Sequence, residues 1–181
     1  MTQAEVEQLG THGWFLREGF PAALEASRDA LQRHAAGEFK PAAISREHRH
    51  DASIRTDSLL WLEAGPLFTA FEALRLELNA GAWLNLQRFD LQLAHYAVGG
   101  HYSRHLDALA GRSNRKVTAI VYLNPGWTPA DGGQLRLYSA PPVDLEPVLG
   151  RTVIFRSEKL EHEVLPSQAT RLAATAWYYG R

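Results

Sequence analysis

Short apolar runs separated by turn-forming residues make up the second half of this chain. After Gly81, six runs have the length and the β-branched or aromatic content of strands. They span residues 89–96, 117–123, 134–138, 152–155, 161–165 and 172–179. Glycine and proline clusters between them, such as Gly99-Gly100 and Pro141-Pro142, mark turns. This succession of short strands predicts a β-sandwich or barrel.

The first half of the chain is predicted to be largely helical. Helices are expected at residues 2–9, from residue 20 to about 36, and at 66–79, with a brief strand at 13–16. In the last helix, apolar residues recur at spacings of four, three and four, at Leu67, Phe71, Leu74 and Leu78. The second helix has a predicted stripe at Leu24, Ser27, Leu31 and Ala35. Such stripes are expected to pack on the outside of the sheet.

The length of 181 residues suits one domain with a sizeable core and is short for two. We therefore expect a single domain over residues 1–181, with a helical support region at 1–85 and a β core at 86–181. The polar segment at about 40–57 has no apolar period and is predicted to be a mobile loop. A loop of this length in a compact domain is usually functional or mobile.

Charge and cysteine content narrow the class of partner. The chain has 19 Lys and Arg against 20 Asp and Glu, so it lacks the basic excess that favours nucleic acid or anionic membranes. No cysteine is present, which excludes thiolate metal ligands and cysteine nucleophiles and suits a reducing compartment. The acidic N-terminus has no secretory pattern, and no apolar run approaches the roughly 20 residues of a membrane span. We expect a cytoplasmic protein.

Two histidines and one aspartate form a candidate metal site. His105 and Asp107 fall on the same side of an extended segment, because side chains in a strand alternate, and His162 follows far downstream. Two imidazole nitrogens and a carboxylate on one face of a metal, with the other face open, are the ligand set of non-haem Fe(II) oxygenases. Taken alone, His105-x-Asp107 is a weak signal and more often marks a surface histidine beside a solvated aspartate. The full ordered set favours the metal site.

Arg171 and Tyr122 are candidates for binding an anion. If Leu172 faces the outer packing layer, Arg171 points inward, where its charge is costly unless an anion meets it. A carboxylate is the natural guest, since guanidinium pairs with it through two parallel hydrogen bonds. Tyr122 shares a strand face with Thr118 and Ile120, and its phenol could reach the same carboxylate. The alternatives are an exposed arginine and an ordinary core tyrosine.

Several motifs occur in a characteristic order. They are Tyr96-x-x-Gly99-x-x-Tyr102-x-x-His105-x-Asp107, Arg115-Lys-Val-Thr-Ala-Ile-Val-Tyr-Leu-Asn124, Gly132-Gly-Gln-Leu-Arg136, Leu145-Glu-Pro147, His162-Glu-Val-x-Pro166 and Arg171-x-x-x-Thr175-x-Trp177-Tyr178. Together they resemble the prolyl 4-hydroxylase family of Fe(II)/2-oxoglutarate oxygenases, and especially the catalytic domain of the hypoxia-inducible-factor prolyl hydroxylases and its bacterial relatives. The resemblance covers about residues 89–179.

The resemblance implies a mainly β fold, a double-stranded β-helix (jelly roll, cupin-like) whose major sheet is supported by the N-terminal helices. It implies that His105, Asp107 and His162 bind Fe(II), and that Arg171 and Tyr122 hold the distal carboxylate of 2-oxoglutarate. By motif position, the cosubstrate pocket would be bordered by Tyr96, Thr175, Leu135 and Trp177.

Two further implications concern the substrate. Arg115 falls where relatives contact substrate, with a solvated arginine as the alternative. The loop at 40–57 falls where relatives carry a mobile flap, with an inert loop as the alternative.

The implied activity is a 2-oxoglutarate-dependent dioxygenase of the peptidyl-prolyl 4-hydroxylase type. It would hydroxylate a target proline in a protein, with O₂ as second cosubstrate, succinate and CO₂ as coproducts, and ascorbate as a helper. Alternatives are hydroxylation of a small molecule or a non-prolyl residue, an inactive jelly-roll binding module, and a zinc-containing cupin-like hydrolase. A halogenase is disfavoured because Asp107 supplies the carboxylate that such enzymes lack. No nucleic acid or membrane partner is expected, and the oligomeric state stays open, with a monomer among the alternatives.

Overall fold

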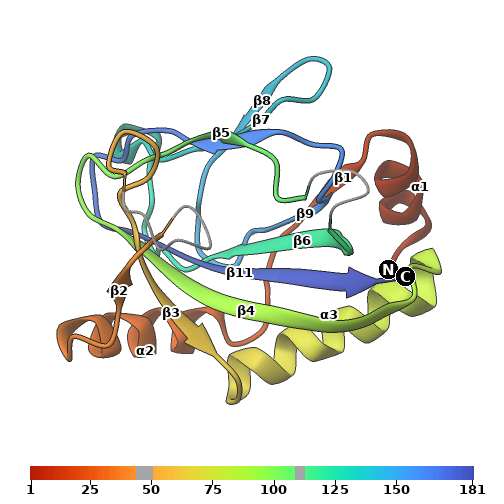
Figure 1. Cartoon of the computed structure of the whole chain (residues 1–181), viewed down its shortest axis with the longest axis horizontal. Helices are drawn as coiled ribbons and strands as arrows, with labels where there is room; N and C mark the ends of the chain where they lie inside the picture. The colour runs from red at the N-terminus through yellow and green to blue at the C-terminus, as the bar shows by residue number, and fades with distance from the viewer. Residues whose placement is uncertain (44–50, 109–112) are drawn as a thin grey trace.

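The computed structural model describes residues 1–43, 51–108 and 113–181. Two antiparallel sheets face each other and hold the candidate site between them (Figure 1). The major sheet has the order β1-β9-β6-β11-β4-β3-β2 and the minor sheet the order β5-β10-β7-β8. Two facing sheets with helices outside the larger one form the jelly roll implied by the motifs, so that expectation is confirmed.

The strands of the major sheet are β1 (Trp14–Arg17), β2 (Lys40–Pro41), β3 (Ser58–Leu62), β4 (Leu86–Tyr96), β6 (Arg115–Tyr122), β9 (Thr152–Arg156) and β11 (Arg171–Gly180). Those of the minor sheet are β5 (Tyr102–His105), β7 (Leu135–Leu137), β8 (Val143–Leu145) and β10 (His162–Val164). All six predicted strands of the second half are present. The strand β8 was not predicted, because it is short and directly follows two prolines that mark a turn.

Three α-helices accompany the sheets, α1 (Gln3–Thr11), α2 (Ala23–Ala35) and α3 (Pro66–Ala82), together with a short 3₁₀ helix, η1 (Pro129–Asp131). Figure 1 shows α2 and α3 beneath the major sheet, on the side away from the minor sheet. α3 buries its predicted stripe, Leu67, Phe71, Leu74 and Leu78, against this sheet. Among the described residues, no helix is long and apolar enough to cross a membrane.

The predicted stripe of α2 is wrong at both leucines, and only its Ser27 is buried. Leu24 and Leu31 are 46% and 47% exposed, whereas the buried residues of the helix are Ala23, Ala26, Ser27 and Ala30. These four positions also recur at helical spacing, but they carry small side chains. Small side chains let the helix axis approach the sheet closely. The buried face of α2 is therefore decided by close packing rather than by side-chain hydrophobicity.

Part of the predicted loop at 40–57 is ordered by pairing. Lys40 and Pro41 pair with β3, and Asp57 at the other end is buried. Arg55 forms an isolated bridge with Tyr102. Residues 44–50, the centre of the predicted loop, lie outside the described residues. The flanks of this segment are therefore part of the fold.

Alternation along the strands separates two cores. On β11, Leu172, Ala174, Ala176 and Tyr178 join the core beneath the helices. The intervening side chains face the minor sheet, and they are Arg171, Ala173, Thr175 and Trp177. The predicted assignment of the two faces is confirmed, because Leu172 does lie on the helix side.

An ion-pair network joins α1, β1 and α3. The Arg17 guanidinium donates to Glu5 at 2.9 Å and to both carboxylate oxygens of Glu77 at 2.9 and 3.0 Å. Hydrogen bonding from Arg17 lowers the pKa of Glu77 to about 2 and also lowers that of Glu5. Because the pKa of Glu77 is lower in the folded state, its ionised carboxylate stabilises the fold at pH values above the unfolded-state pKa of 4.5. This stabilisation is lost as the pH falls toward 2.

We predict that Glu77→Gln removes this acid-sensitive contribution. Glu77 is 37% exposed, so solvent screening limits the loss of unfolding free energy at pH 7 to less than about 1 kcal/mol. The difference in unfolding free energy between variant and wild type should disappear as the pH falls from 4.5 to 2, as measured by urea unfolding of the metal-free protein. Glu25→Gln on α2, whose carboxylate is in no ion pair of the described structure, is the control. An equal difference in unfolding free energy at pH 7 and at pH 2 would contradict a pH-dependent contribution from the Arg17–Glu77 ion pair.

Candidate active site

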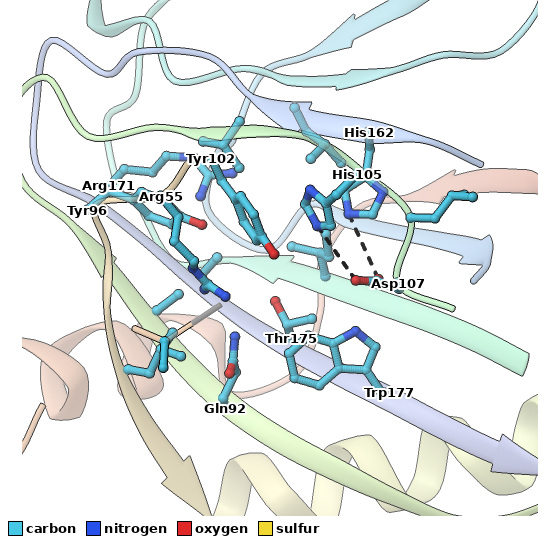
Figure 2. Close-up of a pocket in the computed structure, with 18 of the residues that line it drawn as sticks. Arg55, Gln92, Tyr96, Tyr102, His105, Asp107, His162, Arg171, Thr175 and Trp177 are labelled. Carbon is cyan, nitrogen blue, oxygen red and sulfur yellow. Dashed lines mark ion pairs between the residues drawn. The ribbon is translucent and has the colours of Figure 1, made fainter. Parts of the chain in front are cut away.

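A cavity of about 660 Å³ lies between the two sheets. The major sheet contributes inward-facing side chains from β3, β4, β6 and β11, and the minor sheet contributes β5, β7 and β10. Figure 2 shows the triad His105, Asp107 and His162 at one end and Arg171 with Tyr96 at the other. The candidate metal and anion sites therefore open into one space.

The three predicted metal ligands converge. His105 ends β5, Asp107 follows two residues later, and His162 begins β10 directly opposite His105 in the strand register. One ligand atom from each residue lies within 4.8 Å of the other two. The two imidazole Nε2 atoms are 3.7 and 3.8 Å from the Asp107 carboxylate oxygens (Figure 2). Two nitrogens and one carboxylate suit Fe(II) and related divalent metals.

Hydrogen bonds turn both imidazoles toward the metal position. Nδ1 of His105 is 2.8 Å from the Ser103 carbonyl, and Nδ1 of His162 is 3.2 Å from the Leu160 carbonyl. A carbonyl only accepts, so each Nδ1 carries the proton and each Nε2 keeps a free lone pair. Burial, together with His162, lowers the pKa of His105 to about 4. This imidazole is thus neutral at pH 7, as a metal ligand must be.

Two hydroxyls that sequence reasoning missed orient the carboxylate ligand. Thr118 donates from Oγ1 to Asp107 Oδ2 at 2.7 Å, and its oxygen lies 2.9 Å from Ser157 Oγ. Both hydroxyl residues are fully buried. Burial opposes ionisation of Asp107, but the two imidazoles and the Thr118 hydroxyl outweigh it and lower the pKa of the carboxyl. The available signal was the position of Thr118 on the same strand face as Tyr122.

Arg171 has the environment of an anion-binding residue. It is 1% exposed, and its Nε donates to the Gly133 carbonyl at 2.8 Å. The guanidinium carbon lies 5.0 Å from the Tyr96 ring centroid and 5.2 Å from that of Tyr122. No carboxylate of the described residues pairs with it. A buried unpaired cation is costly, so an anionic ligand fits this position.

Tyr122 leaves a polar atom available beside Arg171. Its side chain is fully buried, and within the described part of the chain its hydroxyl has no hydrogen-bond partner. Burial raises the pKa of Tyr122, so the hydroxyl stays protonated and can donate. An orphaned donor and an unpaired guanidinium side by side match the distal carboxylate of a dicarboxylate such as 2-oxoglutarate.

The other predicted residues share the cavity. Its walls include Tyr96, Leu135, Thr175, Trp177 and Arg115, whereas Tyr122 lies behind the wall beside Arg171.

Arg115 is held by contacts inside the fold. Arg115 donates from Nη1 to the Asp107 carbonyl at 3.2 Å and from Nε to the Tyr179 hydroxyl at 3.0 Å. Its guanidinium carbon lies 4.7 Å from the Trp177 ring centroid. These bonds fix its charge at the metal end of the cavity.

Four polar or aromatic residues that line the cavity were missed as site residues, namely Arg55, Trp61, Gln92 and Tyr102. Arg55 pairs with the buried carboxylate of Asp57 at 2.5 and 2.7 Å, and its guanidinium carbon lies 4.2 Å from the Tyr102 ring centroid. It was missed because the segment before residue 57 has no periodic pattern. The usable signal was the Arg55-x-Asp57 spacing directly before a predicted strand.

The chain is similar to known oxygenases over most of its length. A family model described as the 2OG-Fe(II) oxygenase superfamily matches residues 91–179. Over 163 residues the chain is 32% identical to Egl nine homolog 1 of Homo sapiens. The match covers 81% of this chain and 38% of that protein. The chain thus spans well under half the length of that curated relative.

Two solved structures are similar to nearly the whole chain. A Pseudomonas putida prolyl-4-hydroxylase is 38% identical and covers 98% of both chains, with a TM-score of 0.87. A prolyl hydroxylase from Trichoplax adhaerens, in complex with a hypoxia inducible factor oxygen degradation domain peptide fragment, is 28% identical with a TM-score of 0.88. It covers 97% of this chain and 87% of that chain. Since the matching family model spans the strands of the triad and the Pseudomonas similarity extends end to end, the chain belongs to the 2OG-Fe(II) oxygenase superfamily.

Proposed function

We propose that this protein is an Fe(II)- and 2-oxoglutarate-dependent dioxygenase that 4-hydroxylates prolyl residues of a protein substrate. One observation carries the proposal: the triad of His105, Asp107 and His162 faces the same cavity as the buried, unpaired Arg171. Similarity to two prolyl hydroxylases, one of them bound to a peptide, supports the choice of a prolyl residue in a protein. We propose that residues 1–181 act as one catalytic domain.

Membership of the superfamily brings Fe(II) as the metal, with 2-oxoglutarate and O₂ as cosubstrates. When bound, these supply the oxidation that inserts oxygen into an unactivated C–H bond, with succinate and CO₂ as coproducts. In our proposal, His105, Asp107 and His162 hold the metal through two Nε2 atoms and one carboxylate. The lowered pKa values of His105 and Asp107 favour the neutral imidazole and the ionised carboxylate that a metal requires.

The remaining residues position the cosubstrate and keep water away from it. We assign the distal carboxylate to Arg171 and the Tyr122 hydroxyl, because both have unused donors. Tyr96 and Thr175 would line the pocket along the carbon chain of 2-oxoglutarate. Leu135 and Trp177 would form part of the wall of the same pocket. Arg115 would contact substrate at the metal end of the cavity, where its bonds to Asp107 and Tyr179 hold it.

Two accessory features also belong to the proposal. A cytoplasmic location is supported by a chain without cysteine, which has no disulfide for an oxidising compartment to form. Ascorbate would help to keep the metal reduced.

The substrate class is tested with a degenerate peptide library that has a fixed central proline. After incubation with Fe(II), 2-oxoglutarate and O₂, we expect mass spectrometry to find one added oxygen atom on the prolyl ring, in step with succinate formation. Amino-acid analysis should identify 4-hydroxyproline. Addition of oxygen only to another residue, or only to free small molecules, would contradict the proposal.

We predict that Arg171→Ala raises the KM for 2-oxoglutarate roughly 100-fold, because it removes the charged partner of the distal carboxylate. Arg171→Lys should give a smaller increase, since it keeps the charge and loses the planar fork. Succinate formation measures both values. An unchanged dependence on 2-oxoglutarate in Arg171→Ala would remove the anchoring role.

We predict that Thr118→Val weakens Fe(II) binding about 10-fold, because a hydrogen-bond donor to a ligating carboxylate helps to fix the ligand. Anaerobic titration calorimetry measures the affinity. Thr152→Val is the matched control, since Thr152 is equally buried but its hydroxyl has no partner among the described residues. Equal affinities in the two variants would show that the Thr118 hydroxyl does not orient Asp107.

A further inference from the structure

The central strand β11 divides the floor of the cavity into two sides. On one side lies β6, which carries Tyr122 beside Arg171. On the other side lie β4 and then β3. Under the proposed function, the cosubstrate runs from Arg171 to the triad on the β6 side. The part of the β4 side that lies beyond Tyr96 is then left for the substrate.

Gln92 stands on the β4 side with an unused amide. Its side chain is 4% exposed, and Figure 2 shows it pointing into the cavity beside Arg55 and Thr175. Its amide makes no hydrogen bond to any residue that the structure describes. A carboxamide offers two donor hydrogens and an acceptor oxygen, and here the side chain that carries them lines the cavity. An amide left open toward a cavity indicates a ligand that pairs with it.

The anion-binding end of the cosubstrate site is too far away to supply that ligand. Tyr96 pairs with Arg171 in the strand register, and Gln92 lies four residues before Tyr96 on the same strand face. At about 3.3 Å per residue, roughly 13 Å separates Gln92 from the anion-binding end. Gln92 instead pairs with Thr175 on one side and with Trp61 on the other.

The surroundings of Gln92 favour a neutral ligand with apolar parts. The nearest cation, Arg55, is already neutralised by Asp57. Trp61 is 54% exposed, and its ring centroid lies 5.9 Å from that of Trp177. The two indoles line the same cavity as the carboxamide, so they offer apolar surface beside one polar group. A peptide main chain beside a prolyl ring has this chemistry, since its N–H and C=O match the oxygen and the NH₂ of a glutamine.

We propose that Gln92 is a specificity residue that binds a main-chain peptide group of the substrate segment next to the target proline. The carboxamide oxygen accepts from the peptide N–H and the NH₂ group donates to a peptide carbonyl. Trp61 and Trp177 cover the apolar part of the same segment. This inference rests on the proposed function, because it requires a peptide substrate.

The test uses the full-length enzyme and the peptide that wild type hydroxylates best in the proline-centred library. Gln92→Met keeps the length of the side chain and removes its polar atoms. It should raise the KM for this peptide about tenfold, while the KM for 2-oxoglutarate changes less than twofold. Gln32→Met, an exposed glutamine of α2, is the matched control and should leave both constants at wild-type values.

Ester substitution in the peptide separates direct contact from a structural effect. Each main-chain N–H near the proline is replaced in turn by an ester oxygen. One ester should raise the KM with wild type and have no further effect with Gln92→Met, since the lost bond is shared. A peptide KM within twofold of wild type, or ester penalties that persist undiminished in the variant, would overturn the inference. Those results concern Gln92 alone, whereas failure of wild type to hydroxylate any library peptide would overturn the proposed function and this inference with it.

Discussion

The position of β11 at the centre of the major sheet constrains the rest of the structure. It pairs with β4 along one edge and β6 along the other, so each of its side chains has a fixed direction. One face closes the core against the helices, and the other points Arg171, Thr175 and Trp177 into the cavity. A slip of one residue would exchange these faces and bury a charge among apolar side chains. The same alternation therefore holds both the fold and the site in place.

Buried polarity divides the cavity into regions with different tasks. Carbonyl groups hold the two imidazoles, and the Thr118 hydroxyl, itself paired with Ser157, holds the carboxylate, so the fold orients all three metal-binding groups. Arg171, Tyr122 and Gln92 differ from these groups, because part of their hydrogen-bonding capacity has no partner in the described structure. The groups that orient the triad are therefore paired within the fold, whereas Arg171, Tyr122 and Gln92 keep unpaired groups that a ligand can use.

The sequence was sufficient wherever a local period or an ordered motif governs the structure. Strand alternation predicted the faces of β11, and helical spacing predicted the buried stripe of α3. The convergence of the triad was predicted from the ordered set of His105, Asp107 and His162 and from the resemblance, although 57 residues separate the two histidines. Spacing failed for α2, where small residues pack better than the two leucines. Spacing also missed Thr118 and Gln92, because their roles depend on neighbours from distant strands. It missed Arg55 because the segment before residue 57 has no periodic pattern.

The central claim is that the triad and Arg171 form one Fe(II) and 2-oxoglutarate site. Its most direct test is anaerobic reconstitution with Fe(II) followed by 2-oxoglutarate, monitored for the visible metal-to-ligand charge-transfer band of the chelated cosubstrate. Wild type should develop the band in proportion to bound iron, and His162→Ala should not. The absence of a band in wild type, or a band of full intensity in His162→Ala, would contradict the account.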